Sequence, residues 1–241
     1  MKFLRPSHFS PGYTIMRITY ITEFVGTFFL VLTIGLVIAS GTALAPVAIG
    51  SALMVMVYMG GHISGAHYNP AVTLAIWMRG KLETKHVAPY MIFQLLGAIA
   101  AAYVSYFLTG KSFAPAPGAS ASIGQALLVE VLFTFALAIV VLNVATSRQT
   151  TGNSFYGLAI GFTVLTGAFA GGGISGGAFN PAVGIGPAIV NMLVAGGSLA
   201  QSWIYLVGPF AGAIIAALLF RAQNPEDAEQ SIPAAPAGEK L

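Results

Sequence analysis

Residues 61–72, GHISGAHYNPAV, recur as GGISGGAFNPAV at residues 172–183, with eight of twelve positions identical and no gap. Each copy ends in Asn-Pro-Ala-Val, which opens an apolar stretch at residues 69–77 and again at residues 180–190. Each stretch is about half as long as the ~20 apolar residues that a membrane-spanning helix needs. The repeat therefore predicts two short helices, one at the end of each motif, and the remaining segments must be arranged around them.

The composition places these motifs in a membrane. Of 241 residues, 56% are hydrophobic and only 7% are charged, and the mean hydropathy is +0.83. Soluble domains are about one quarter charged, so this composition excludes an ordinary soluble domain. It also excludes a nucleic-acid-binding protein, which needs a basic face for phosphate contacts. Because the chain has no cysteine, disulfides, thiol catalysis and thiolate metal sites are excluded as well.

Six further apolar stretches are long enough to span a bilayer. They are residues 18–38, 46–61, 87–108, 125–145, 155–170 and 201–220. The sequence thus predicts an all-α membrane protein with six transmembrane helices and two re-entrant half-helices in one domain, residues 18–221. Its halves, about 18–108 and 125–221, each contain three full spans, so the second half must enter the membrane from the opposite side. Such inverted repeats place their functional site near the midplane, at the interface between the repeats.

The basic residues predict the orientation. Nine of the ten fall before the first span, after the last, or in the connections on one side: Lys2, Arg5, Arg17, Arg79, Lys81, Lys85, Arg148, Arg221 and Lys240. The positive-inside rule makes that side cytoplasmic. We therefore expect a cytoplasmic N-terminal segment at residues 1–17, a disordered cytoplasmic tail at 222–241, and a flexible external loop without functional residues at 109–122. The short termini and the lack of a targeting signal favour a prokaryotic plasma membrane.

The motif residues indicate what could pass between the half-helices. Proline suits the first turn of a helix and asparagine suits its N-cap, so Asn69 and Asn180 should cap helices that begin at Pro70 and Pro181. Each helix then points its positive end at the centre of the protein. This potential repels cations, while the asparagine amides can donate hydrogen bonds to a polar neutral molecule. The pattern favours passage of uncharged solutes with exclusion of protons and ions.

These motifs resemble the aquaporin (major intrinsic protein) family over residues 18–220. The resemblance rests on two Glu-x-x-x-Thr openings at Glu23 and Glu130, two Gly-x-Ile-Ser-Gly stretches, and two Asn-Pro-Ala triplets: Asn69, Pro70, Ala71, Asn180, Pro181 and Ala182. It implies a pore in each subunit of a homotetramer that passes water and small neutral solutes. It also implies no enzymatic activity and no cofactor or metal. Glu23 and Glu130 would support the re-entrant loops.

The family has a second constriction of four residues, which by this resemblance are Ile49, Ala168, Gly177 and Val183. Strict water channels have an aromatic residue, a histidine and an arginine there, and this sequence departs from all three. The plant vacuolar-membrane branch is similar in having valine after the second Asn-Pro-Ala. Small and aliphatic residues imply a wider, less polar constriction. We therefore expect passage of water with ammonia, urea, hydrogen peroxide or glycerol.

Several alternatives remain open at this level. Glycerol facilitation as the main role is disfavoured by Gly184 and Ala188, where glycerol facilitators have an aspartate and a basic residue. Glu23 and Glu130 could instead serve a proton relay, since ionisable groups within spans are functional by default. His67 is expected in the cytoplasmic vestibule of the pore, where it could line the path or gate it by protonation. An intramembrane enzyme lacks a nucleophile–base pair or metal set, and an ion-coupled transporter lacks enough charged residues within the spans.

Overall fold

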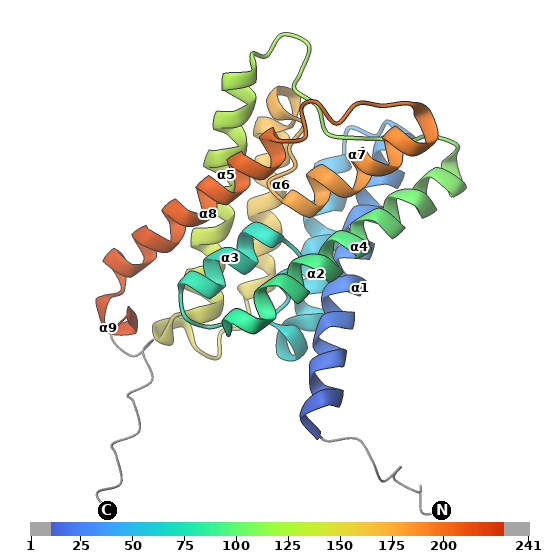
Figure 1. Ribbon diagram of the computed structural model, residues 1–241. Coiled ribbons are helices and arrows are strands. Elements are labelled where there is room, and N and C mark those ends of the chain that lie inside the picture. Colours follow the sequence, from blue (N-terminus) through green and yellow to red (C-terminus); the bar gives the residue numbers. More distant parts are fainter. Residues whose placement is uncertain (1–10, 229–241) are drawn as a thin grey trace, which may run out of the picture.

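Helices account for most of residues 11–228, the part of the chain that the computed structural model describes (Figure 1). In chain order they are α1 (Pro11–Ser40), α2 (Ala45–Ser64), α3 (Pro70–Met78), α4 (Thr84–Thr109), α5 (Ile123–Thr146), the 3₁₀-helix η1 (Arg148–Thr150), α6 (Tyr156–Ser175), α7 (Pro181–Ala195), α8 (Ile204–Gln223) and α9 (Pro225–Ala228). These described residues contain no strand. The predicted all-α class is therefore confirmed.

Among the described helices, six are long and apolar enough to cross a membrane: α1, α2, α4, α5, α6 and α8. They coincide with the six predicted spans, and α3 and α7 coincide with the two predicted half-helices. The helices extend beyond the predicted limits, because α1 begins at Pro11 and α8 continues to Gln223. Helix α9 also lies within the segment expected to be a disordered tail. The rest of that tail, residues 229–241, and residues 1–10 with Lys2 and Arg5 lie outside the described residues, as does Lys240.

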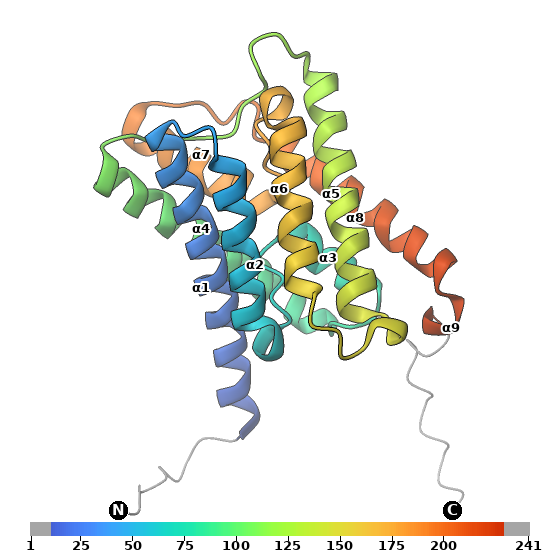
Figure 2. The same ribbon diagram turned by 180° about the vertical axis from the view of Figure 1, so that it is seen from behind.

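The two halves of the chain repeat one packing scheme. Helix α1 packs on α4 in the first half as α5 packs on α8 in the second, and α2 packs on α6 across the halves. Each half-helix contacts the opposite half, since α3 packs on α8 and α7 packs on α4. In Figure 1, α3 lies toward the end where α1 begins and α8 ends, and α7 lies toward the other end. Figure 2 shows the same opposition from behind, so the predicted inverted repeat is confirmed.

Glycine allows the α2 and α6 backbones to touch. A Cβ atom on Gly50 would lie 2.6 Å from the carbonyl oxygen of Gly161, and one on Gly161 would lie 2.5 Å from that of Gly50. Because both distances are far below contact distance, any larger residue would separate the helices. Small residues at such crossings are typical of helix packing inside membranes. The outer surface, in contrast, presents large apolar side chains such as Phe107 and Leu193.

Candidate functional site

The two half-helices begin in the same way at the centre of the molecule. Asn69 and Asn180 have extended backbone conformations, and Pro70 and Pro181 occupy the first helical positions. The Oδ1 atom of Asn69 accepts a hydrogen bond from the backbone N–H of Ala71 at 2.8 Å. The structure shows the corresponding bond in α7, where Asn180 caps the helix. Each asparagine therefore caps its own half-helix through the amide oxygen, which leaves the amide nitrogen for other contacts.

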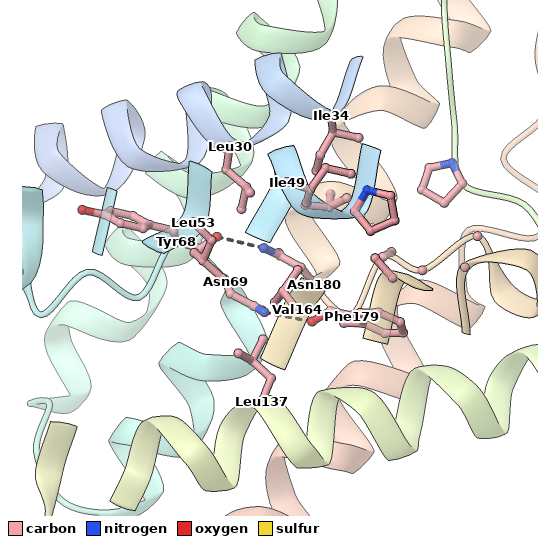
Figure 3. Close-up of a pocket in the computed structure, with 18 of the residues that line it drawn as sticks. Leu30, Ile34, Ile49, Leu53, Tyr68, Asn69, Leu137, Val164, Phe179 and Asn180 are labelled. Atoms are coloured by element: carbon pink, nitrogen blue, oxygen red, sulfur yellow. Dashed lines mark hydrogen bonds between the residues drawn. The ribbon is translucent and has the colours of Figure 1, made fainter. Parts of the chain in front are cut away.

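The amide nitrogens connect the two halves. The Nδ2 atom of Asn69 donates to the carbonyl oxygen of Phe179, and Nδ2 of Asn180 donates to that of Tyr68, both at 2.9 Å (Figure 3). An asparagine amide carries two N–H donors, so each side chain retains one beyond its bond to the opposite half. Both asparagines line a cavity, and Figure 3 shows them with Leu30 on one side and Leu137 on the other. The site thus has paired amide donors between apolar walls.

Glu23 holds the loop that leads into α3. Its carboxylate accepts hydrogen bonds from Ser64 Oγ at 2.6 Å, from the backbone N–H of His67 at 3.0 Å and from that of Tyr68 at 2.7 Å. A fourth bond comes from Gln94 Nε2 at 2.8 Å. Because Tyr68 has a left-handed backbone (φ 50°), the loop is strained, and these bonds keep it in place.

Glu130 does the same for the loop that leads into α7. It accepts from Ser175 Oγ at 2.7 Å and from the backbone N–H groups of Ala178 at 3.0 Å and Phe179 at 2.7 Å. Both Glu23 and Glu130 are fully buried, and neither lines the cavity around the asparagines or the second cavity described below. The contacts fit the loop-supporting role better than a proton relay along the pore.

Two tyrosines that sequence reasoning did not assign also support these loops. Tyr90 on α4 donates its hydroxyl to the carbonyl oxygen of Ser64 at 2.7 Å. Tyr205 on α8 donates to the carbonyl oxygen of Ser175 at 2.5 Å. Gln94 was missed as well, although it bonds Glu23. These residues lie far from the motifs in sequence, and no local pattern marks them.

His67 belongs to the polar network beside the first half-helix. Its Nδ1 atom lies 3.1 Å from Thr73 Oγ1. The Thr73 hydroxyl donates its single proton to the carbonyl oxygen of Asn69, and it accepts from Gln94 Nε2. Thr73 therefore links His67 to Gln94 and to the beginning of α3. His67 lines the cavity that contains the asparagines, and its place in the cytoplasmic vestibule stays a prediction.

Two cavities of about 400 Å³ each lie along one path through the protein. The first cavity surrounds the asparagine pair and extends to the end of α1, the beginning of α2 and the α4–α5 connection. The second cavity extends to the α5–α6 connection and includes His62. Both are lined by Ala66, Val141 and Ile160, so they meet beside the loop that precedes α3. Between them they reach from one end of the bundle to the other, and we refer to the pair as the conduit.

The structure places the four expected constriction residues in the wall of the first cavity: Ile49, Ala168, Gly177 and Val183. The same wall contains residues 113–116 from the α4–α5 connection, which the sequence predicted to be a flexible loop without a function. The sequence did not indicate that this connection reaches the cavity, and its flexibility stays a prediction. Its residues carry no periodic or motif signal, so only their contacts with distant helices place them at the cavity.

Comparisons with known proteins agree with this geometry. Residues 13–220 match the family model described as "Major intrinsic protein". The chain belongs to the major intrinsic protein family. This membership confirms the predicted family, an integral multi-pass membrane protein and a passive channel for water and small solutes rather than an enzyme.

Individual relatives cover most of the chain. A glycerol uptake facilitator protein-like 6 from Lactiplantibacillus plantarum is 39% identical, over 86% of this chain and 99% of the relative. Aquaporin AqpM from Methanothermobacter thermautotrophicus is 37% identical, over 83% of this chain and 95% of the relative. The solved aquaglyceroporin from Plasmodium falciparum has 23% identity and a TM-score of 0.79, covering 88% of this chain and 98% of that one, which supports the fold. The likeness to the plant vacuolar-membrane branch stays a prediction.

Proposed function

We propose that this protein conducts water together with small uncharged solutes, including glycerol, ammonia, urea and hydrogen peroxide. The size limit is set by the four-residue constriction: Ile49, Ala168, Gly177 and Val183. The observation that carries this proposal is the conduit itself, in which these short or aliphatic side chains share a wall with two amide donors. Pore diameter and the hydrogen-bonding groups that line a pore decide what passes through it.

Exclusion of ions follows from the electrostatics of the conduit. Helices α3 and α7 both direct their N-termini at the asparagine pair, and each N-terminus carries about half a positive charge. Among the described residues, neither cavity is lined by an Asp, Glu, Lys or Arg side chain. A cation would therefore lose its hydration shell without gaining a counter-charge. An ion- or proton-coupled transporter would need such charged groups facing its site.

Facilitation of glycerol as the main role is the second candidate. It is supported by the name of the Lactiplantibacillus relative, a glycerol uptake facilitator protein-like 6. Against it, Gly184 and Ala188 are buried and do not line either cavity. A Cβ atom on Gly184 would lie 2.2 Å from Cβ of Tyr205, so this position has no room for an aspartate. We therefore place water first and glycerol among the accompanying solutes.

The protein is proposed to form a homotetramer in a prokaryotic plasma membrane, with both termini cytoplasmic. Homotetramers are implied by the family resemblance. The orientation is supported by the described basic residues. Arg221 bonds the carbonyl oxygen of Met78, and the Gln149 side chain next to Arg148 bonds Glu226, so these groups share one end of the bundle. Lys111 lies at the opposite end, where it bonds the carbonyl oxygen of Ala39.

Stopped-flow light scattering on proteoliposomes tests the constriction. In wild-type vesicles we expect water, glycerol and urea fluxes above those of empty vesicles. Val183→Arg adds a long side chain with five N–H donors and a permanent charge, so it should reduce glycerol and urea flux more than water flux. Val183→Met, which adds length without charge, should reduce solute flux less. Wild-type vesicles that pass water but neither glycerol nor urea would contradict the proposed solute range.

A further inference from the structure

The two cavities of the conduit meet at a narrow apolar section. Among the described residues, three line both cavities: Ala66, Val141 and Ile160. They are 6%, 7% and 5% exposed, respectively. Because each residue borders both cavities and still offers little surface to a water molecule, the passage between the cavities is narrow. We call this section, formed by Ala66, Val141 and Ile160, the neck.

The neck is separate from the asparagine pair and from the four-residue constriction. Asn69 and Asn180 line the first cavity, and neither lines the second. The four constriction residues likewise line the first cavity and not the second. A solute that has passed the constriction and the asparagines must therefore still pass the neck before it reaches the other end of the conduit.

The inverted repeat relates the neck to the constriction. Helices α2 and α6 both have 20 residues, and they end at the serines of the two motifs, Ser64 and Ser175. The alignment of the motifs therefore continues without a gap along both helices. It pairs each constriction residue with a residue of the other half: Ile49 with Ile160, Ala168 with Val57, Gly177 with Ala66, and Val183 with Val72. This equivalent set, Val57, Ala66, Val72 and Ile160, includes two of the three neck residues.

The structure repeats the local geometry at one of these pairs. The backbone N–H of Ala66 donates to Ser64 Oγ at 3.1 Å, and that of Gly177 donates to Ser175 Oγ, also at 3.1 Å. Both serine hydroxyls in turn donate to the buried glutamates that hold the loops. Ala66 is therefore fixed at the neck in the same way as Gly177 is fixed at the constriction.

The equivalent set has more bulk than the constriction. Two of the four pairs are identical, isoleucine with isoleucine and valine with valine. In the other two pairs Ala66 stands in place of Gly177, and Val57 stands in place of Ala168. Every member of the set lines at least one of the two cavities. Residues that match the constriction position by position, and add bulk at two positions, should restrict a solute at least as strongly.

We propose that the neck is a second size filter, in series with the constriction and produced by the same duplication, and that Ile160 is its main specificity-determining residue. The inference rests on the proposed channel function, because it concerns which solutes pass. The neck side chains are apolar and offer no hydrogen bond, so a solute passes only if it fits and can give up hydration there. Glycerol should therefore be slowed more than water.

Flux ratios in proteoliposomes test this role. Ile160→Ala should raise the ratio of glycerol flux to water flux several-fold, and Ile160→Phe should lower it. The matched control is Ile92→Ala, since Ile92 is 55% exposed on α4 and lines neither cavity. This control should leave the ratio unchanged. The double variant Val57→Ala/Ala66→Gly gives the equivalent set the residues of the constriction and should also raise the ratio. Glycine suits the left-handed backbone at position 66 (φ 51°).

The possible outcomes separate the inference from the function on which it rests. Wild-type vesicles without water flux overturn both. Wild-type vesicles that conduct water and glycerol, together with an unchanged ratio in Ile160→Ala, overturn only the filter at the neck. An equal change in Ile92→Ala overturns it as well, because that side chain lies outside the conduit. If Ile160→Ala does not fold, the double variant decides the question, since a ratio equal to that of wild type then excludes the filter.

Discussion

The two repeat halves share one loop geometry but surround it with different side chains. Glu23 and Glu130 bind their loops at matching distances, with 2.6 and 2.7 Å to the serine hydroxyls and 2.7 Å to the N–H of Tyr68 and of Phe179. The hydrogen bonds that the two asparagine amides donate across the halves are both 2.9 Å long. The duplicated unit is therefore the buried carboxylate, the strained loop and the capped half-helix.

The halves differ in what fills the space around that unit. The motifs begin at residues 61 and 172, so His67 corresponds to Ala178 and Thr73 to Gly184. Beyond the motifs, Tyr90 corresponds to Tyr205, because each donates its hydroxyl to the carbonyl oxygen of the motif serine in its own half. The first half has a polar network in which Gln94 bonds both Glu23 and Thr73. In the second half a glycine, Gly184, accommodates Tyr205, whose hydroxyl reaches the loop. The first half thus supports its loop with additional hydrogen bonds from Gln94. In the second half the Tyr205 side chain occupies the space that the lack of a side chain at Gly184 provides.

The largest effect is expected from removing the carboxylates. Glu23→Ala leaves four hydrogen-bond donors without an acceptor, and Glu130→Ala leaves three. Each unsatisfied buried donor costs about 1–3 kcal/mol. Both variants should show strongly reduced thermal stability in detergent and lose water flux, with the larger loss in Glu23→Ala.

An exposed carboxylate provides the control for this pair. Glu83 forms an ion pair with Lys85 at 2.7 Å on the surface, where both side chains are largely exposed. Glu83→Ala should therefore leave the midpoint of thermal unfolding nearly unchanged, since exposed ion pairs contribute little. A Glu130→Ala variant as unstable as Glu23→Ala would show that the extra bond from Gln94 does not strengthen the first half.

A smaller effect, on selectivity rather than folding, is expected at the asparagines. Asn69→Asp and Asn180→Asp keep the oxygen that caps the half-helix but replace the Nδ2 donor by a carboxylate oxygen. The negative charge offsets the positive ends of α3 and α7, so cations should begin to pass. Because the two cross-half bonds have equal length, we expect similar currents from both variants in planar bilayers, and none from wild type.

Asn143 offers a matched control on α5. Its Nδ2 atom donates to the carbonyl oxygen of Ile139 at 2.9 Å, and its side chain does not line either cavity. Asn143→Asp should therefore remain without current although it introduces the same charge into the same helix bundle. Currents from only one of the two pore variants would mean that the halves differ in electrostatics as well as in packing.

The sequence predicted those parts of the molecule that local patterns encode. The spans follow from hydrophobic length, and Asn-Pro-Ala at 69–71 and 180–182 marks the half-helices through cap and first-turn preferences. Gln94 and Tyr90 could not be assigned a role, because a polar residue within a span shows its partner only after the helices have packed. The α4–α5 connection was missed for the same reason. Its place at the cavity depends on bonds to Ala39, Asn191 and Ile174, which are distant in sequence.

The smallest effect on stability is expected at the two tyrosines that support the loops. Because the tyrosines make equivalent hydrogen bonds, their variants compare the two halves directly. Tyr90→Phe and Tyr205→Phe each remove one hydroxyl donor to a loop carbonyl, a loss of about 1 kcal/mol. The first-half loop is also held through Gln94, so Tyr205→Phe should lower the thermal midpoint more than Tyr90→Phe. The double variant Tyr90→Phe/Gln94→Leu removes both supports and should be at least as destabilised as Tyr205→Phe. A larger loss in Tyr90→Phe alone would reverse the comparison, because it would show that the first loop depends more on its tyrosine than on its glutamine.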